Sequence, residues 1–346
     1  MTGQQAAAAG RRAAHRVPLP AAIAGVGLLA VVSLFVGVID LGPGAVLRDL
    51  VDPGAAGDAT RLLLVSRLPR TVAVVLTGAA LAIVGLIMQM LARNRFVEPS
   101  TIGTVEWASL GLLGVTILTP ALPVAGKLGV AAVCALIGTA VFLRVLRAVP
   151  LRDPLVVPLV GLMLSGVVGA LATFVAFRFD LLQSLGAWTL GDFSGVLRGR
   201  YELLWLVAVL AVVAYVAADR FTVAGMGEDV ATNLGLNHAA VLRLGLAIVA
   251  MVTAVVVVVV GAVPFLGLVV PNLVSLTVGD DVRRGLPWVA VLGAGLTLAA
   301  DLLGRVVRFP YEIPVGVVMG VLGSGLFLWF LLAQKKIQHR EPIGAR

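Results

Sequence analysis

Residues 71–92 form a run of 22 positions without a charge, and this run constrains the fold more than any other feature of the sequence. At a rise of about 1.5 Å per residue, such a helix is about 33 Å long, which is enough to cross the roughly 30 Å hydrocarbon core of a bilayer. Arg93 and Arg95 follow the run, as expected for a cytoplasmic loop that holds a membrane helix in place. Arg67 and Arg70 precede it, at the opposite end of the same helix, where cations need another explanation.

The composition places the whole chain in a membrane. Hydrophobic residues make up 60% of the 346 positions and charged residues only 13%, with a mean hydropathy of +1.06. A soluble domain of this size carries about 25% charged residues, so we expect a polytopic membrane protein without a sizeable soluble domain. We expect an all-α fold, because an open strand in lipid would leave backbone groups unpaired. The net charge of +8 does not indicate nucleic acid, since most cations lie in short loops between apolar spans.

Charge-free runs and prolines divide the chain into about ten predicted transmembrane helices. The uncharged run 244–279 would be about 54 Å long as one helix, so we expect Gly261, Pro264 and Pro271 to break it. Residues 181–191 are too few to cross and predict a re-entrant or interfacial helix. The predicted spans are 18–40, 70–92, two within 104–147, 155–178, 202–219, 240–260, 265–279, 286–304 and 313–334.

Ten spans place both termini on one side of the membrane. With the N-terminus inside, 16 of the 26 lysines and arginines fall on the cytoplasmic side, which supports this orientation. The expected organisation is a cytoplasmic tail (1–17), a transmembrane permease domain (18–334) and a second cytoplasmic tail (335–346). A signal peptide is the alternative for the first apolar run, but that run is longer than a usual signal sequence and no clear cleavage site follows it.

Several kinds of chemistry find no support in the sequence. There is no P-loop for nucleotide binding, no nucleophile–base arrangement, and no metal cluster among His15, His238, His339 and Cys134. Self-powered carriers use carboxylates at mid-membrane depth, whereas Asp301 and Glu312 lie near predicted span ends. Gln89 favours a helix–helix hydrogen bond over a binding site. The remaining class is a transporter driven by a partner protein.

Six groups of residues lie along the chain from the second predicted span to the last. They are Arg67-Leu-Pro-Arg70 with Gly78-Ala-Ala-Leu81, Gly85 and Gln89; Arg93-Asn94 with Glu98-Pro99 and Gly103; Trp188 with Leu190, Gly191 and Ser194; Gly227-Glu228 with Ala231 and Leu234-Gly235; Gly261 with Phe265, Gly267-Leu268 and Pro271; and Asp301 with Arg305, Glu312, Pro314 and Gly316. Taken together, over about residues 20–334, they resemble the FecCD-type permeases of ABC importers, which move iron–siderophores, haem and cobalamin.

This resemblance implies the fold of cobalamin-permease-like type II ABC importers and a function in a bacterial cytoplasmic membrane. It implies a permease dimer, of identical or paralogous chains, with two ATPase subunits inside and a substrate-binding protein outside. The chain would be a transporter subunit rather than an enzyme and would bind no cofactor covalently, because the partner ATPase uses the ATP. Arg95, Asn272 and Ser275 depart from the common family pattern. RNRFVEPSTIGT, PFLGLVVPN and FPYEIPVG look most like the catecholate-siderophore subgroup, which indicates ferric siderophore as substrate.

Other functions stay open at this point. Within the family, cobalamin or haem is the alternative substrate. Outside it, the alternatives are a secondary transporter or channel, which would take up substrate without partners, and a membrane scaffold without transport.

The resemblance also implies two functional surfaces. Arg67, Arg70 and Arg305 would face outward and dock acidic residues of the binding protein, since guanidinium groups can grip carboxylates bidentately. The alternative is that these arginines anchor helix ends or pair with Asp301 and Glu312. The cytoplasmic loop 224–239 would hold the ATPase coupling segment, although a plain connector is the alternative. The coupling residues implied are Gly227, Glu228, Ala231, Leu234 and Gly235.

Overall fold

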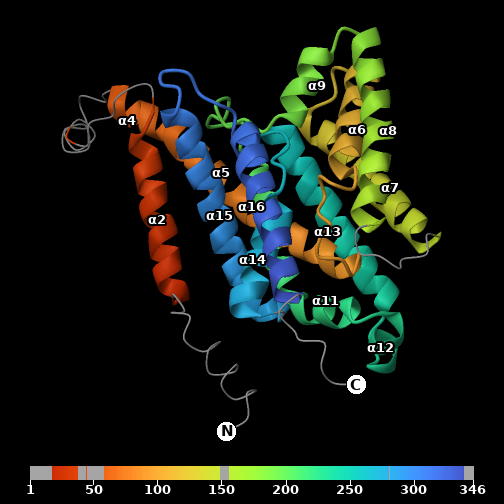
Figure 1. The fold of residues 1–346 in the computed structure, drawn as a ribbon. Coiled ribbons are helices and arrows are strands. Elements are labelled where there is room, and N and C mark those ends of the chain that lie inside the picture. The colour runs from red at the N-terminus through yellow and green to blue at the C-terminus, as the bar shows by residue number, and fades with distance from the viewer. Residues whose placement is uncertain (1–17, 38–43, 45–57, 149–155, 280, 339–346) are drawn as a thin grey trace.

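The computed structural model describes residues 18–37, 44, 58–148, 156–279 and 281–338, and no strand occurs among them. The all-α prediction is confirmed (Figure 1). The predicted tail 1–17 and the last eight residues of the predicted tail 335–346 lie outside the described residues. The helical elements are α2 (Leu19–Phe35), α4 (Asp58–Leu62), the π-helical turn η1 (Leu63–Arg67), α5 (Leu68–Leu91), α6 (Thr104–Leu118), α7 (Val124–Ala148), α8 (Val156–Arg178), α9 (Leu182–Thr189), α10 (Leu204–Val216), α11 (Ala218–Gly225), α12 (Glu228–Asn233), α13 (His238–Val259), α14 (Leu266–Val278), α15 (Val282–Val306) and α16 (Val315–Gln338).

Each of the ten predicted spans coincides with a helix. Within the described ranges, five helices are long and apolar enough to cross a membrane, and a sixth span results if the bent pair α10 and α11 is counted as one. Four more apolar helices, α2, α6, α14 and the apolar part of α16, are shorter. The segment predicted to be too short to cross is α9, with eight residues.

The second span begins earlier than the sequence predicts. The helix is continuous from Ala59 to Leu91, because α4, η1 and α5 follow one another without a break. Arg67 and Arg70 are therefore inside the helix rather than ahead of it. A charge-based boundary placed the start at residue 70, and the helix extends past it because Arg67 and Arg70 have polar partners in the folded chain.

Helix α5 is the central element of the bundle. It packs against α10, α11, α13, α14 and α15, and most of its residues are buried. At the crossing with α14 the two backbones lie so close that there is no room for a side chain on Gly85. An added Cβ there would lie only 2.1 Å from the carbonyl oxygen of Gly267. In lipid there is no hydrophobic driving force between helices, so van der Waals packing at small residues helps to hold them together.

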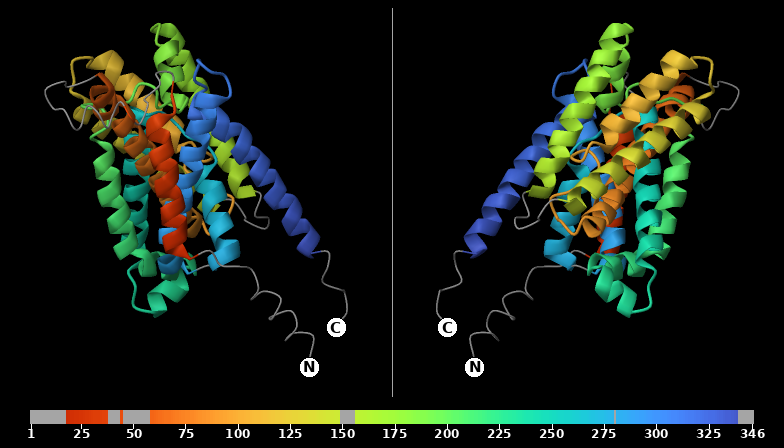
Figure 2. Two further views of the ribbon diagram at one scale, coloured as in Figure 1. Left: turned by 90° about the vertical axis from the view of Figure 1, so that its left-hand side faces the viewer. Right: turned by 90° about the vertical axis from the view of Figure 1, so that its right-hand side faces the viewer.

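Two helix groups flank α13. Helices α6, α7, α8 and α9 pack together on one side, and α2, α5, α14, α15 and α16 on the other (Figures 1 and 2). Helix α13 contacts both α5 and α7, so it joins the two groups. The beginning of α2 and the end of α16 lie at the same end of the bundle as α12, and α4 and α9 lie at the opposite end.

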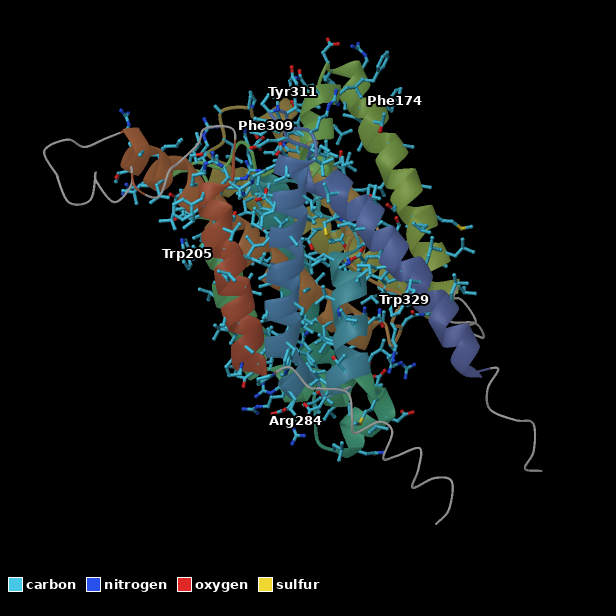
Figure 3. All side chains as sticks on the ribbon, turned by 60° about the vertical axis from the view of Figure 1, so that its left-hand side comes forward. Phe174, Trp205, Arg284, Phe309, Tyr311 and Trp329 are labelled. Carbon is cyan, nitrogen blue, oxygen red and sulfur yellow. The ribbon has the colours of Figure 1, made fainter. Side chains whose placement is uncertain are left out.

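The sides of the bundle are apolar, as lipid contact requires. Phe174 on α8, Trp205 on α10 and Trp329 on α16 are exposed and project from the ribbon (Figure 3). Phe309 and Tyr311, also exposed, lie near one end, and Arg284 lies near the other. This distribution agrees with a bundle that crosses the bilayer along its long axis.

The uncharged run 244–279 is broken where the sequence predicts. Helix α13 ends at Val259, and Gly261 has a φ of +82°, a backbone conformation that disfavours residues with a Cβ. The residues after α13 bond to the last turn of α9 and to the segment after it. Asp192 N donates to the carbonyl of Val260 at 2.8 Å, and Ala262 N donates to the carbonyl of Trp188 at 3.2 Å. These bonds satisfy backbone groups that the break leaves free.

Candidate functional site

Arginine side chains close the C-terminal end of helix α2. The last carbonyls of a helix have no partner within it and attract cations. Arg67 Nη1 donates to the carbonyl of Val36 at 2.5 Å, and Arg305 Nη1 donates to the carbonyls of Ser33 and Val36, each at 2.9 Å. The arginines thereby tie α2 to α5 and α15.

A buried ion cluster adjoins this helix end. Asp301, on α15, accepts from Arg70 Nη2 at 2.8 Å through Oδ1 and from Arg305 Nη2 through Oδ2. Arg70 Nη1 also donates to Glu312 Oε2 at 2.6 Å. Asp301 is 0% exposed, so its charge is stable there only because two guanidinium groups surround it. We call Arg67, Arg70, Asp301, Arg305 and Glu312 the outer cluster, after the side of the membrane on which the sequence predicts these arginines to lie.

The three predicted docking arginines are thus brought together, and they are buried. Arg67, Arg70 and Arg305 are 7%, 8% and 3% exposed. Arg70 and Arg305 adopt the pairing with Asp301 and Glu312 that the sequence left open as the alternative. Their docking role stays a prediction, and it now requires a partner's carboxylate to compete with contacts inside the chain.

The predicted coupling segment, within residues 224–239, contains the short helix α12 and lies at the end of the bundle opposite the outer cluster (Figure 1). Helix α11 is bent by 62° from α10, and α12 follows it directly (Figure 1). Gly227 and Gly235 flank α12 with φ values of +116° and +76°. Asn237 then caps α13, because its side chain accepts from Ala240 N at 3.0 Å. Local sequence therefore sets both ends of the segment.

The coupling segment has one anchored side and one exposed side. Ala231 is fully buried, whereas Glu228 is exposed. Val230 and Leu234 are 41% and 66% exposed and stand four residues apart, which places them near one another on a helix surface. Sequence reasoning named Leu234 but missed Val230, and the i, i+4 apolar spacing in an otherwise polar loop is the signal that could have found it.

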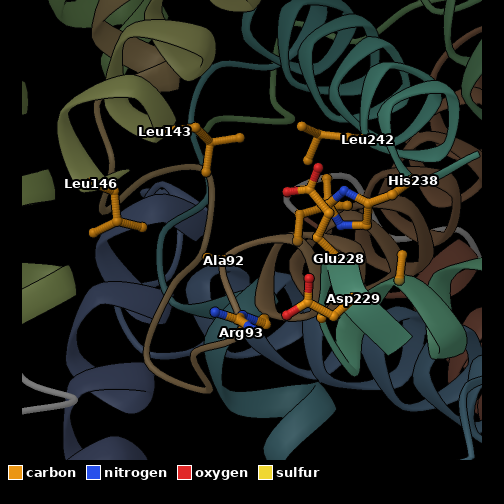
Figure 4. A pocket seen from close by; sticks show the side chains of 11 residues that line it. Ala92, Arg93, Leu143, Leu146, Glu228, Asp229, His238 and Leu242 are labelled. Carbon is orange, nitrogen blue, oxygen red and sulfur yellow. The ribbon is translucent and has the colours of Figure 1, made fainter. Parts of the chain in front are cut away.

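A cavity of about 540 Å³ lies between the coupling segment and the ends of α5 and α7. Charged and imidazole side chains of Arg93, Glu228, Asp229 and His238 line one part of it (Figure 4). Apolar side chains of α7 and α13 line the rest, including Leu143 and Leu242. The cavity leaves space beside α12 on the side that faces the bundle.

The loop between α5 and α6 is fastened to the start of α14. Glu98 Oε1 accepts from Phe265 N at 2.8 Å and from Ser100 Oγ at 2.5 Å. A carboxylate at this place satisfies a free N–H at the beginning of a helix and favours its dipole. Gln89 Nε2 donates to the carbonyl of Gly267 at 3.3 Å, so the predicted helix–helix hydrogen bond is confirmed.

Two further carboxylates lie inside the bundle, away from the outer cluster. Glu98 is 2% exposed, and Glu106, in the first turn of α6, has an Oε2 atom without a hydrogen-bond partner in the part of the chain that the structure describes. Carboxylates inside a membrane bundle are costly and are expected to be functional. Carboxylates that are at least partly buried are therefore not limited to Asp301 and Glu312, and carboxylate position alone does not separate a partner-driven transporter from a self-powered carrier.

Among the described residues, no group of three or more His, Cys, Asp or Glu side chains is arranged to hold a metal ion.

Comparisons with known proteins agree with this architecture. The sequence profile of the FecCD transport family matches residues 25–333. A petrobactin import system permease protein, YclN of Bacillus subtilis, is 47% identical over 309 residues, which cover 89% of this chain and 96% of the relative. The ferric-anguibactin transport system permease protein FatD of Vibrio anguillarum is 43% identical over 274 residues, covering 79% of this chain and 87% of the relative.

A solved structure has the same fold. It is described as an inward-facing conformation of a metal-chelate type ABC transporter, and it superimposes with a TM-score of 0.75 at 22% sequence identity. The match covers 91% of this chain and 98% of that one.

Proposed function

Because this chain belongs to the FecCD transport family, we propose that it is the permease subunit of an ATP-driven importer that carries a ferric siderophore across the cytoplasmic membrane. The observation that carries the proposal is the near full-length similarity to two permeases named for siderophore import, at 47% and 43% identity. The bundle of apolar helices supplies the membrane path, and ATP hydrolysis belongs to separate subunits.

The exposed side of the coupling segment is the proposed ATPase contact. Leu234 and Val230 are apolar and exposed at the end of the bundle opposite α4 and α9, where the chain has charged rather than lipid-facing surroundings. Glu228 adds a carboxylate beside them, and Gly227, Ala231 and Gly235 shape and anchor the segment. An ATPase subunit that buries this surface would move α12 when it closes on ATP.

The outer cluster is the proposed contact for a substrate-binding protein. It contains three arginines and two carboxylates, so one positive charge is in excess. Exposed aromatic residues lie close by in the loop before α16, where Arg308 stands 5.8 Å from the ring of Tyr311. Acidic groups on a binding protein would be attracted to this end of the permease.

We further propose that two permease chains, identical or paralogous, form the path between them, with both termini in the cytoplasm. The start of α2 and the end of α16 lie at the same end of the bundle as the coupling segment, which supports this orientation (Figure 1).

Reconstitution tests the proposed function. The permease should be assembled in liposomes with its ATPase and binding protein and supplied with radiolabelled ferric siderophore, ferric haem or cobalamin. We expect ATP-dependent uptake of ferric siderophore and little of the other two. If the complex prefers cobalamin or haem, the proposed substrate is wrong. If the purified permease alone takes up substrate without ATP, the chain is a secondary transporter or channel rather than an ABC permease.

The docking prediction is tested separately with Arg67→Glu. Reversal of this charge places a carboxylate beside the carbonyl of Val36 and the excess positive charge is lost. We expect the affinity of the binding protein for the reconstituted permease to fall at least tenfold, most strongly at low salt, because dissolved ions screen the attraction between the binding protein's acidic groups and this end of the permease. Arg67→Lys retains the charge and is the control. Equal affinity for both variants would contradict a docking role.

A further inference from the structure

Helix α5 ends in a backbone conformation that an arginine rarely adopts. Arg93 has a φ of +47°, in the left-handed region where glycine is usual. Two hydrogen bonds complete the helix end: Asn94 N donates to the carbonyl of Gln89 at 3.0 Å, and Arg93 N donates to the carbonyl of Met90 at 3.2 Å. Glycine would satisfy the same bonds with less strain, so the arginine side chain requires a separate reason.

The side chain of Arg93 lies against the entry to the coupling segment. Its Nη1 atom is 2.9 Å from the position that a Cβ at Gly227 would occupy. Gly227 is buried, has a φ of +116°, and immediately precedes α12. The guanidinium group therefore occupies the space that any larger residue at 227 would need.

A second contact lies next to the first. A Cβ at Gly225, the last residue of α11, would lie 3.1 Å from Sδ of Met90. Met90, in the last turn of α5, and Arg93, two residues beyond its end, thus rest on two glycines that stand on either side of Met226. The absence of side chains at these glycines lets the end of α5 approach the backbone that leads into α12.

The same helix reaches the outer cluster at its other end. Arg70, in the first turn of α5, is paired with Asp301 and Glu312. Helix α5 has 24 residues and is buried along most of its length, so it is a stiff connection of about 36 Å between the two ends of the bundle. Loss of the contact at Gly227 would leave that connection intact but remove the direct contact between the end of α5 and the residue that precedes α12.

We propose that Arg93 is a positioning residue that couples α12 to α5, so that displacement of α12 by an ATPase subunit is passed along α5 to the transport path. This proposal rests on the proposed function as an ATP-driven importer, and it adds a residue that acts through the coupling segment rather than by contact with substrate or nucleotide. The rigid, planar guanidinium group of Arg93 fills the space between the end of α5 and Gly227.

The decisive variant is Arg93→Gly. It removes the guanidinium group and at the same time relieves the left-handed backbone, so failure to fold is not the expected result. In the complete complex in liposomes, we expect ATP hydrolysis to continue while the amount of ferric siderophore imported per ATP hydrolysed falls at least tenfold. Arg93→Lys, which keeps the charge but not the planar group, should recover only part of the loss.

Arg284→Ala is the matched control. Arg284 is an exposed arginine at the same end of the bundle, and its ion pair with Asp281 is local. We expect this variant to import as much substrate per ATP as the unmodified permease. If removing any positive charge at this end impairs transport, both variants will import less substrate per ATP. If Arg93 acts in coupling, only the Arg93 variant will import less.

The outcomes separate this inference from the proposed function. If the unmodified complex shows no ATP-dependent uptake, the proposed function fails. If the unmodified complex imports ferric siderophore and Arg93→Gly matches it in substrate moved per ATP, the positioning role of Arg93 is overturned. Loss of ATPase binding by the Arg93→Gly permease in a pull-down assay would also overturn it, because Arg93 would then be part of the binding surface.

Discussion

Replacement of Leu234 by aspartate is expected to reduce ATP-driven uptake by the reconstituted complex at least tenfold. Leu234 is 66% exposed on the coupling segment, so the substitution leaves no cavity in the permease itself. If an ATPase subunit buries this side chain, the change removes about 1.5–3 kcal/mol of apolar burial and adds a charge that must be desolvated. A loss of about 1.4 kcal/mol already weakens an interaction tenfold. Uptake of labelled ferric siderophore and ATP hydrolysis should be measured on the same preparation.

The controls for Leu234 lie on the same short helix. Thr232→Ala changes an exposed polar residue next to it and should leave uptake unchanged, whereas Glu228→Gln tests whether the adjacent carboxylate contributes. Membrane content of every variant should equal that of the unmodified permease, because these side chains are exposed. Normal uptake by Leu234→Asp would mean that α12 is a plain connector.

Replacement of Asp301 by alanine is expected to destabilise the permease by about 3–5 kcal/mol, because it leaves two buried arginines without their shared carboxylate. Arg70 would retain only Glu312, and Arg305 would retain only uncharged oxygen partners at the end of α2. The free energy of unfolding should be measured by denaturant titration in mixed micelles, with the unmodified chain alongside.

An exposed ion pair supplies the control for Asp301. Arg283 and Asp219 also form a salt bridge between distant segments, but both side chains are more than half exposed. Such pairs contribute little to stability, so Asp219→Ala should unfold at the same denaturant concentration as the unmodified chain. If Asp301→Ala is as stable as Asp219→Ala, the outer cluster does not hold α2, α5 and α15 together.

The sequence was sufficient to predict the helices because lipid imposes a simple rule. Residues that cross a bilayer must be apolar, must satisfy their own backbone hydrogen bonds, and must be about 20 in number. That rule placed each of the ten predicted spans on a helix and located the break near Gly261. It erred at the start of the second span, since Arg67 and Arg70 were taken as an end when they lie within a continuous helix.

The structures of the two predicted functional surfaces follow from the sequence to different degrees. The helical turn at the predicted coupling segment could be expected from the sequence because its signals are local: flanking glycines and a short polar stretch lie within 16 residues. The arrangement of the outer arginines could not be expected in this way, because the partner of Arg70 is Asp301, 231 residues away. Charge counting can show that cations stand on an unusual side, but it cannot show whether they face solvent or a buried carboxylate.

The sequence alone determined that the chain is an all-α membrane protein, where its helices lie, and which family it belongs to, because these depend on composition, periodicity and local motifs. Only the tertiary structure decided which charges meet, that the first helix is closed by Arg67 and Arg305, and that Arg93 rests on Gly227. The physical reason is that these contacts join segments far apart in the chain, and their distances are set by how α2, α5 and α15 pack. The arginines around the 22 uncharged residues 71–92 are visible in the sequence, but their partners are fixed only by folding.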